Sequence, residues 1–263
     1  MGSERLKTWP VPIMVIIRPL ILSKPNKGAR TIISMTGNIG DMGRKYDLAI
    51  FDMDGTLTSV SSSWWYILNE LGCDNEEARN AFVNGEIDEK EFMRSDLAQW
   101  MRAMPGITMS DVIRMIRNLP LISGIQETVA MLHYNGIKCA ICSGGLSCAA
   151  KMIADEFGFD AYLADDLEVD DEGRLTGEGI ANVDLRDKGA SAMKLMERFG
   201  TTKERTIAIG DSFGDLSMFD VTGMSIAFNP KDMEITAERA DHVIFSDNIS
   251  EILDVIFEVE NGI

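Results

Sequence analysis

The chain contains 263 residues, of which 45% are hydrophobic and 25% are charged, so it can bury a substantial core and is neither fibrous nor wholly disordered. Its 25 Lys and Arg stand against 42 Asp and Glu, and the net charge of -17 repels the phosphate backbone of nucleic acids. We therefore expect no nucleic-acid partner. The length fits one large domain, or one core that carries a smaller inserted domain.

The first 44 residues differ in character from the rest of the chain. Residues 1–45 hold eight Lys and Arg against two Asp and Glu. The apolar run at 11–22 is interrupted by two prolines and an arginine, and it is shorter than the roughly 20 apolar residues that cross a bilayer. We expect residues 1–44 to be a poorly ordered extension, with a targeting signal or surface anchor as the alternative. We expect no membrane partner.

The four cysteines are too few for a disulfide framework in a chain of this length, so we expect a reducing, cytoplasmic setting. Cys139 and Cys142 form a CxxC pattern at the end of an apolar run that is typical of a strand. Residues three apart on a strand face opposite sides of a sheet. We therefore interpret both cysteines as core residues and not as a redox pair or zinc ligands.

From residue 46 onward, predicted strands and helices alternate. A buried strand at 48–51 is followed by a largely helical region up to residue 120. The helices expected there carry Trp64, Ile67, Leu68 and Leu71 and then cover 75–83, 88–103 and 109–118. The later elements expected in chain order are a helix at 124–135, a strand at 137–142, a helix at 146–157, a strand at 160–164, a hairpin at 167–180, a helix at 187–199, a strand at 206–210, a helix at 214–220, a strand at 224–227, a helix at 231–238, a strand at 242–245 and a helix at 249–259.

Strands that alternate with helices indicate a parallel sheet with crossover helices. The sequence therefore predicts an α/β fold, a Rossmann-like doubly wound parallel sheet with an inserted helical cap domain. Residues 45–60 and 121–263 form the catalytic core in this prediction, and residues 61–120 form the cap.

Polar residues follow the predicted strands, where ligands of a doubly wound sheet bind. The residues at these strand ends are Asp52, Asp54, Ser143, Gly144, Asp211 and Asp215, and Lys188 begins the helix that precedes the strand at 206–210. Two carboxylates about 4 Å apart repel by about 4 kcal/mol at an effective dielectric constant of about 20, so such a cluster requires protonation or a bound cation. Oxygen ligands favour Mg²⁺ over zinc, with Asp52 and Asp211 as its carboxylates. Asp215 is placed to orient Lys188 or to bind an ordered water.

A phosphate held at this edge of the sheet gives the remaining residues chemical roles. Asp52 is positioned as a nucleophile that forms an aspartyl-phosphate. Asp54 is expected to protonate the leaving oxygen and then to activate water. Ser143 and the amide of Gly144 are expected to bind the phosphoryl oxygens of the substrate. Lys188 is expected to stabilise the charge of the transferring group.

The order of these motifs resembles that of a known family. Asp52–Thr58 (DMDGTLT), Ser143–Gly145 (SGG), Lys188 and Gly210–Asp215 (GDSFGD) are similar to the four ordered motifs of the haloacid dehalogenase superfamily of phosphohydrolases. Within it, the SGG turn, the LTGEG segment and residues 223–244 resemble phosphoserine phosphatases. The resemblance implies a mobile cap that closes over the substrate, and Mg²⁺ bound by Asp52, Asp211 and the backbone carbonyl of Asp54.

Specificity residues depart from the phosphoserine phosphatase pattern. Those enzymes carry a glutamate nine residues after the nucleophile, where it holds the substrate ammonium, and this chain has Ser61 there. They also use a cap arginine against the substrate carboxylate, and Arg94 is the nearest substrate-binding candidate. Gly214 stands where those enzymes usually have asparagine. The aromatic run at 64–66 is placed to pack on a larger or more apolar leaving group.

We predict a Mg²⁺-dependent phosphomonoesterase that hydrolyses a small phosphorylated metabolite, with phosphoserine as the leading substrate. One alternative is a phosphatase of the same superfamily with a different small substrate. The other is a signalling module whose aspartyl-phosphate is the output, but receiver domains place no acid where this chain has Asp54. A catalytically silent binding protein is disfavoured because every chemical position is filled.

Overall fold

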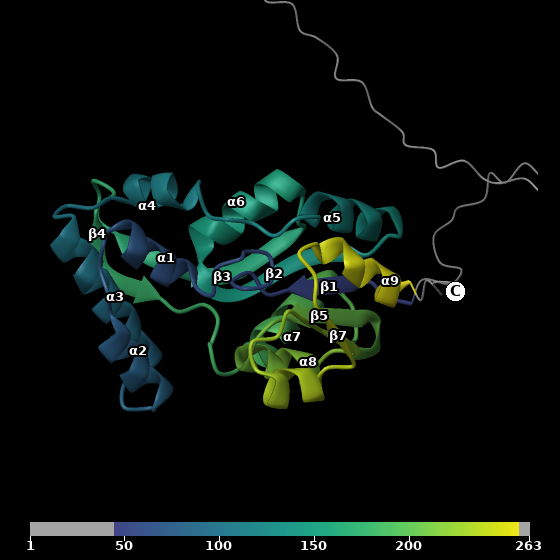
Figure 1. Cartoon of the computed structure of the whole chain (residues 1–263). Helices are drawn as coiled ribbons and strands as arrows, with labels where there is room; N and C mark the ends of the chain where they lie inside the picture. The colour runs from purple at the N-terminus through teal and green to yellow at the C-terminus, as the bar shows by residue number, and fades with distance from the viewer. Residues whose placement is uncertain (1–44, 258–263) are drawn as a thin grey trace, which may run out of the picture. The chain divides into compact units, whose positions relative to one another are not determined.

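The computed structural model describes residues 45–257, so the expectation for residues 1–44 lies outside the described residues. The sheet has seven strands in the order β4-β3-β2-β1-β5-β6-β7 (Figure 1). Their bounds are β1 Leu48–Phe51, β2 Lys138–Leu146, β3 Ala161–Val169, β4 Leu175–Ile180, β5 Thr206–Gly210, β6 Met224–Phe228 and β7 His242–Ile244. The described strands pair in parallel except for β4, which runs antiparallel to β3.

The central strand β1 ends at the same edge of the sheet as its neighbour β5. Phe51 lies beside Ile141 of β2 and beside Ile209 of β5. Because these strands are parallel, the segments that follow them emerge at the same edge of the sheet. The predicted α/β arrangement with a doubly wound parallel sheet is therefore present.

Helices cover both faces of the sheet. The helices are α1 Ser63–Glu70, α2 Glu76–Val83, α3 Glu89–Ala103, α4 Met109–Ile116, α5 Ile125–Tyr134, α6 Ser147–Phe157, α7 Lys188–Phe199, α8 Leu216–Asp220 and α9 Ile252–Ile256. Short 3₁₀ turns are η1 Lys203–Arg205, η2 Phe213–Asp215 and η4 Ile249–Glu251, and η3 Met233–Ala237 is a π-helical turn. Helices α5, α6 and α9 pack on one face of the sheet, and α7 and α8 pack on the other (Figure 1).

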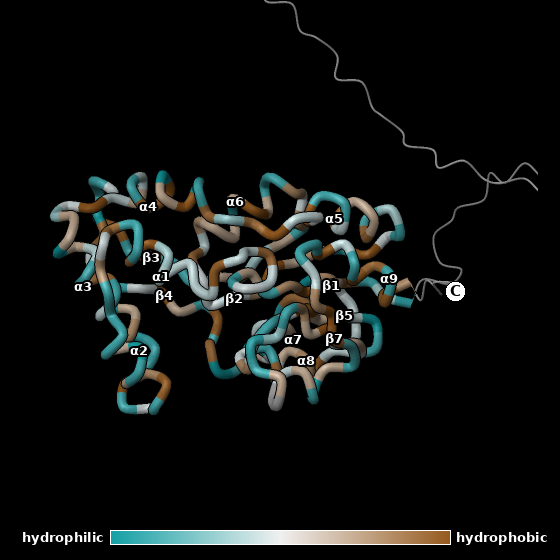
Figure 2. Tube along the Cα trace, in the orientation of Figure 1, coloured by the Kyte–Doolittle hydropathy of each residue, from teal (hydrophilic) through white to brown (hydrophobic). Residues whose placement is uncertain are grey.

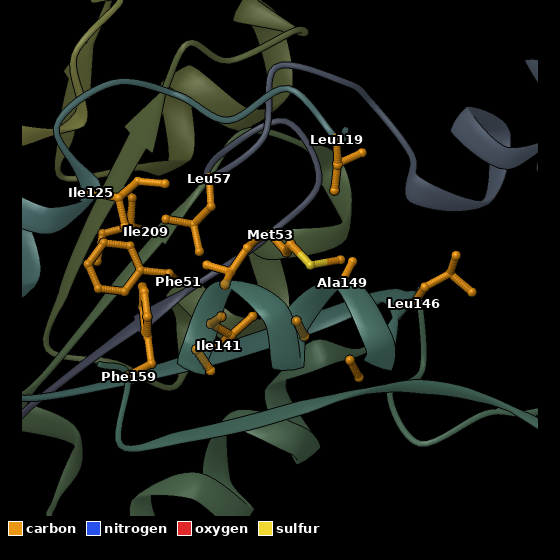
Figure 3. Packing of buried hydrophobic residues seen from close by; sticks show 14 of the residues in the cluster. Phe51, Met53, Leu57, Leu119, Ile125, Ile141, Leu146, Ala149, Phe159 and Ile209 are labelled. Carbon is orange, nitrogen blue, oxygen red and sulfur yellow. The ribbon is translucent and has the colours of Figure 1, made fainter. Parts of the chain in front are cut away.

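The core on the α5–α6 side anchors the loop that carries the first acidic motif. Phe51 meets Phe159 edge-on, with ring centroids 5.6 Å apart, and both lie in the cluster of Figure 3. Met53 and Leu57 belong to the same buried cluster. Since successive side chains of an extended segment alternate in direction, burial of Met53 turns its neighbour Asp52 away from this core.

The two cysteines of the CxxC pattern are both free and fully buried. Cys139 belongs to the core cluster on the α5–α6 side, and Cys142 belongs to the cluster on the α7–α8 side. The interpretation of both as core residues on opposite faces is confirmed. Burial raises the pKa of the Cys142 thiol to about 12, which makes it a poor nucleophile.

The helices predicted up to residue 120 are present as α1–α4. Capping boxes define two of their starts, formed by Asp88 with Glu91 for α3 and by Thr108 with Asp111 for α4. Figure 2 shows hydrophobic and hydrophilic residues in alternation along α4 and α6, as expected for helices with one buried side. Within residues 45–257, no helix combines the length and the apolarity needed to cross a membrane. The division into core and cap stays a prediction.

The segment 160–180 differs from the sequence-based expectation of a short strand and a separate hairpin. The strand β3 is continuous, because it pairs in parallel with β2 as far as Asp165 and then antiparallel with β4 from Asp166 onward. Asp165 and Asp166 interrupt the apolar pattern of the strand, so the extension of β3 beyond residue 164 could not be predicted from hydrophobicity.

The tip of the β3–β4 hairpin contacts the helical insertion. The amide of Met109 donates to the carbonyl of Gly173 at 2.9 Å, and the amide of Leu175 donates to the carbonyl of Ile107 at 3.0 Å. Gly179 of β4 lies so close to Met93 of α3 that a β-carbon there would come within 2.8 Å of the Met93 side chain. The hairpin therefore joins the sheet to α3 and α4.

Candidate active site

Three acidic residues and one lysine meet at the carboxyl edge of the sheet. Asp52 follows β1, Asp211 follows β5, Asp215 ends η2, and Lys188 is the first residue of α7. All four are at most 3% exposed. One carboxylate oxygen from each of the three acids lies within 4.8 Å of the others. The structure thus brings together four of the residues that the strand-end argument selected.

Lys188 bridges two of the acids. Its Nζ lies 2.8 Å from Oδ1 of Asp52 and 2.7 Å from Oδ1 of Asp215. Burial alone disfavours the charged lysine, but the negative charges of Asp215 and Asp52 outweigh it and raise the pKa of Lys188 above its usual value. Lys188 is therefore a permanent cation beside the candidate nucleophile.

The carboxylates at this edge of the sheet outnumber the lysines beside them. Burial, and then the charge of Asp215, raise the pKa of Asp52 despite the neighbouring Lys188. Burial and the charge of Asp52 raise the pKa of Asp211 to about 7, although Nζ of Lys231 lies 2.5 Å from Oδ2 of Asp211. Burial is the largest cause of both shifts, and a further positive charge at this edge would favour the ionised form of both carboxylates.

Unsatisfied oxygens indicate where that charge would bind. Oδ1 of Asp54 and Oδ1 of Asp211 are buried and have no hydrogen-bond partner among the described residues, while Oδ1 of Asp52 and Oδ2 of Asp211 each face a lysine ammonium. Buried polar atoms are normally satisfied. Hard oxygen donors suit Mg²⁺. The residues present therefore fit a divalent cation held by Asp52 and Asp211.

Asp215 organises the turn after β5. Its Oδ2 accepts hydrogen bonds from the amides of Asp211 and Ser212, each at 3.0 Å, and from the Ser212 hydroxyl at 3.1 Å. Its other oxygen, Oδ1, accepts from Lys188 at 2.7 Å. Of the two roles expected for Asp215, this geometry matches the orientation of Lys188.

Asp54 is held by the start of α1. Its Oδ2 accepts from the amide and from the hydroxyl of Ser63, both at 2.8 Å. The same hydroxyl accepts from the amide of Leu146 at 2.9 Å, which ties α1 to the end of β2. Burial raises the pKa of Asp54 to about 6, against the lowering effect of the Ser63 amide. Sequence reasoning missed Ser63 because its partner Leu146 lies 83 residues away.

Ser63→Ala is expected to lower kcat about 10- to 100-fold, because it removes the hydroxyl that orients Asp54 and satisfies the Leu146 amide. The measurement is kcat with an aryl phosphate, beside the urea unfolding midpoint. Ser225→Ala is the matched control, since the Ser225 hydroxyl also donates to a carboxylate, Asp241, and accepts a backbone amide. An equal loss of kcat in both variants would contradict a role of Ser63 in positioning Asp54.

Glycines allow three loops to approach one another. A β-carbon on Gly145 would overlap the Asp54 carboxylate and the Ser63 hydroxyl. Gly55 has a φ of 92°, and a β-carbon there would overlap the side chains of Asp211 and Lys231. Both positions therefore require glycine, and the SGG turn lies directly against Asp54.

A cavity of about 690 Å³ opens between the acidic cluster and the helical insertion. From the core it is lined by Asp52, Asp54, Ser143, Gly144, Gly145, Asp165, Leu185, Lys188, Ser212, Gly214 and Lys231. From the insertion it is lined by Ser61, Ser62, Trp64, Trp65, Leu68, Asp74, Asn75, Glu76, Arg79, Phe82, Val83, Phe92, Met93 and Asp96. Both expected phosphate-binding residues, Ser143 and Gly144, thus face the same space as Asp52.

Several positions around this cavity differ from the candidates selected by sequence. Arg94 is not among the lining residues, and its Nε pairs with Oε2 of Glu178 at 2.7 Å in an exposed ion pair. Its substrate-binding role stays a prediction. Lys231, Arg79 and Asp96 line the cavity but were not selected. The strand-end argument, applied to β6, would have pointed to the segment that carries Lys231.

Comparison with known proteins identifies the class of enzyme. The sequence profile of haloacid dehalogenase-like hydrolases matches residues 49–220. The chain therefore belongs to the haloacid dehalogenase-like hydrolase family, and the identification made from its motifs is confirmed.

Several similar proteins carry the name phosphoserine phosphatase. The phosphoserine phosphatases of Methanocaldococcus jannaschii and Idiomarina loihiensis are each 30% identical to this chain, over 82% and 81% of it and over 100% and 94% of their own lengths. The phosphoserine phosphatase of Archaeoglobus fulgidus is 29% identical over 81% of this chain, which spans 60% of that protein.

Solved structures agree with the sequence relatives. A phospho-aspartyl intermediate analogue of a phosphoserine phosphatase matches with a TM-score of 0.67 and 30% identity, covering 80% of this chain and 99% of the other. A substrate-bound phosphoserine phosphatase complex matches with a TM-score of 0.68 and 29% identity, covering 80% and 98%. The predicted fold class is confirmed by these similarities.

Proposed function

We propose that the protein is a Mg²⁺-dependent phosphomonoesterase that acts through an aspartyl-phosphate, with phosphoserine as its leading substrate. The observation that carries this proposal is the position of Lys188, which is ion-paired with Asp52 at the edge of the sheet where Oδ1 of Asp211 has no partner among the described residues. The similarity to phosphoserine phosphatases supports the choice of substrate.

The proposed reaction has two steps. Asp52 attacks phosphorus, the bond from phosphorus to the leaving oxygen breaks, and Asp54 gives that oxygen a proton. Asp54 then takes a proton from water as the water attacks the aspartyl-phosphate, which releases phosphate and restores Asp52. Lys188 stabilises negative charge during both transfers, while Ser143 and the amide of Gly144 bind the phosphoryl oxygens.

The proposed metal site uses Asp52, Asp211 and, as the family resemblance implies, the backbone carbonyl of Asp54. Bound Mg²⁺ would supply positive charge that offsets the repulsion between the phosphoryl group and the carboxylates.

Removal of divalent metal is expected to abolish turnover of an aryl phosphate, and added Mg²⁺ is expected to restore it. The assay is p-nitrophenyl phosphate hydrolysis after EDTA treatment and dialysis, with and without Mg²⁺. Metal-independent turnover would contradict the proposal, and stoichiometric phosphorylation without turnover would favour a signalling module.

In a panel with phosphothreonine, phosphoglycolate and sugar phosphates, phosphoserine is expected to have the highest kcat/KM. Equal values would contradict the substrate assignment.

A further inference from the structure

The inner surface of the helical insertion contains a hydrogen-bonded junction between α2 and α3. Asn75, the N-cap residue of α2, donates through Nδ2 to Oδ1 of Asp96 at 2.7 Å and to Oγ of Ser95 at 3.0 Å. Asp96 is 3% exposed, and both Asn75 and Asp96 line the cavity. The junction therefore places a buried carboxylate in the wall that faces the acidic cluster.

Arg79 lies one helical turn after this junction. Its amide donates to the carbonyl of Asn75 at 3.1 Å, and residues four apart on a helix have β-carbons about 5–6 Å apart. Among the described residues, three basic side chains line the cavity. Lys188 and Lys231 are ion-paired with carboxylates of the core, whereas Arg79 forms no ion pair with any described residue.

Asp96 carries a charge that the described protein does not balance. It forms no ion pair with a described lysine, arginine or histidine, and its described side-chain partner is the neutral amide of Asn75. Burial raises the pKa of Asp96 to about 6, although the Asn75 hydrogen bond lowers it in part, so the group is largely ionised at neutral pH. A buried carboxylate without a cation is destabilising, and such a group in a cavity wall indicates a cationic ligand.

We infer that Asp96 and Arg79 determine substrate specificity, Asp96 by binding the ammonium and Arg79 by binding the carboxylate of an O-phosphorylated amino acid. This inference rests on the proposed function, because it requires the phosphoryl group to lie at Asp52. Ser61, which also lines the cavity, has no charge to offer an ammonium. Asp96 and Arg79 thus supply from α2 and α3 the two charges that the substrate requires.

The surroundings of the pair favour this ligand over a second phosphate or an anionic sugar. Asp74 and Glu76 line the same part of the cavity, so Arg79 lies in an acidic environment that repels a leaving group of net negative charge. The apolar side chains of Trp64, Leu68 and Phe92 line the cavity as well. Asp96 is 3% exposed, so water weakens its attraction to an ammonium only a little, whereas Arg79 is exposed and its attraction to a carboxylate is screened more strongly.

Three substrates that differ by one charge test the inference. L-Phosphoserine carries both groups, phosphoethanolamine lacks the carboxylate, and 3-phosphoglycerate has a hydroxyl in place of the ammonium. The wild-type kcat/KM is expected to be about 30-fold or more lower for each analogue than for phosphoserine, as for the loss of one charged contact.

Each substitution is expected to remove the preference for phosphoserine over one of the two analogues and to keep its preference over the other. Arg79→Gln is expected to lower kcat/KM about 30-fold for phosphoserine and 3-phosphoglycerate, but not for phosphoethanolamine. Asp96→Asn is expected to lower it about 30-fold for phosphoserine and phosphoethanolamine, but not for 3-phosphoglycerate. Arg102→Gln and Glu77→Gln are matched controls, because both residues are exposed in the same two helices outside the cavity lining.

Two further measurements separate the possible failures. If the wild type does not hydrolyse p-nitrophenyl phosphate, the proposed function fails. If all variants hydrolyse it and Arg79→Gln and Asp96→Asn keep both preferences, the inference fails while the proposed function stands. It is also overturned if Arg94→Gln or Asp74→Asn, and not Arg79→Gln or Asp96→Asn, removes a preference.

Thermal unfolding distinguishes recognition from a purely structural role of Asp96. Because the asparagine keeps an acceptor for Asn75 and removes an unbalanced charge, Asp96→Asn is expected to raise Tm at pH 7.5 by roughly 5 °C. A lower Tm together with an equal loss of kcat/KM on all three substrates would assign Asp96 to folding alone and overturn the inference.

Discussion

Asp52→Asn is expected to lower kcat by about 10⁴-fold or more, because an amide cannot act as the nucleophile that forms the aspartyl-phosphate. The substitution is nearly isosteric, and Lys188 keeps its contact with Asp215 at 2.7 Å. The site should therefore stay folded while its first chemical step is lost. Steady-state turnover of p-nitrophenyl phosphate and rapid-quench detection of phosphoenzyme measure this step.

Asp166→Asn serves as the matched control for this variant. Asp166 lies on β3 and does not line the cavity, and its carboxylate accepts hydrogen bonds from the Ser147 hydroxyl and from the amide of Leu167. It is expected to keep kcat within a few-fold of the wild-type value. Phosphoenzyme accumulation in Asp52→Asn would show that another residue is the nucleophile.

Lys188→Met is expected to have the largest effect on stability, because it leaves Asp52 and Asp215 buried without their shared cation. Breaking a buried ion pair from one side costs about 3–5 kcal/mol of unfolding free energy. The same change removes the cation next to the transferring phosphoryl group, so kcat is expected to fall about 10³-fold. Urea unfolding in metal-free buffer and turnover with saturating Mg²⁺ measure the two effects separately.

A second substitution distinguishes the electrostatic explanation from simple loss of packing. Asp215→Asn in the Lys188→Met background removes one of the two unpaired charges, so it is expected to recover part of the lost stability but none of the activity. If the double variant is less stable than Lys188→Met by the full effect of Asp215→Asn alone, charge repulsion is not the cause.

Much of the site could be predicted from the sequence, because its residues lie next to recognisable strands and helices and because parallel strands end at the same edge of a sheet. Asp52, Asp211 and Lys188 lie directly at the ends or starts of elements with clear hydrophobic patterns, so errors of one or two residues in the element bounds did not move them. Parallel pairing of β1 with β2 and β5 then brings the strand ends to one edge.

The recognition surface was harder to predict because it depends on contacts between helices. A hydrophobic pattern finds α2 and α3, but it does not tell which polar residues of each helix face the cavity. Arg94 and Asp96 are two residues apart on α3, and they point to different surroundings, an exposed ion pair and the cavity wall. The hydrogen bond from Asn75 to Asp96 spans 21 positions of the chain, so no local signal announces it.

The continuous strand β3 has a consequence for how the cavity admits its ligand. One end of the strand is fixed between β2 and the core, and the hairpin beyond it is bonded to residues 107–109 of the insertion. The insertion is therefore joined to the rest of the protein at three places, namely the chain before α1, the chain after α4 and the hairpin. We expect any movement of α1–α4 relative to the sheet to bend β3 and β4 as well, or to break the hydrogen bonds at the hairpin tip.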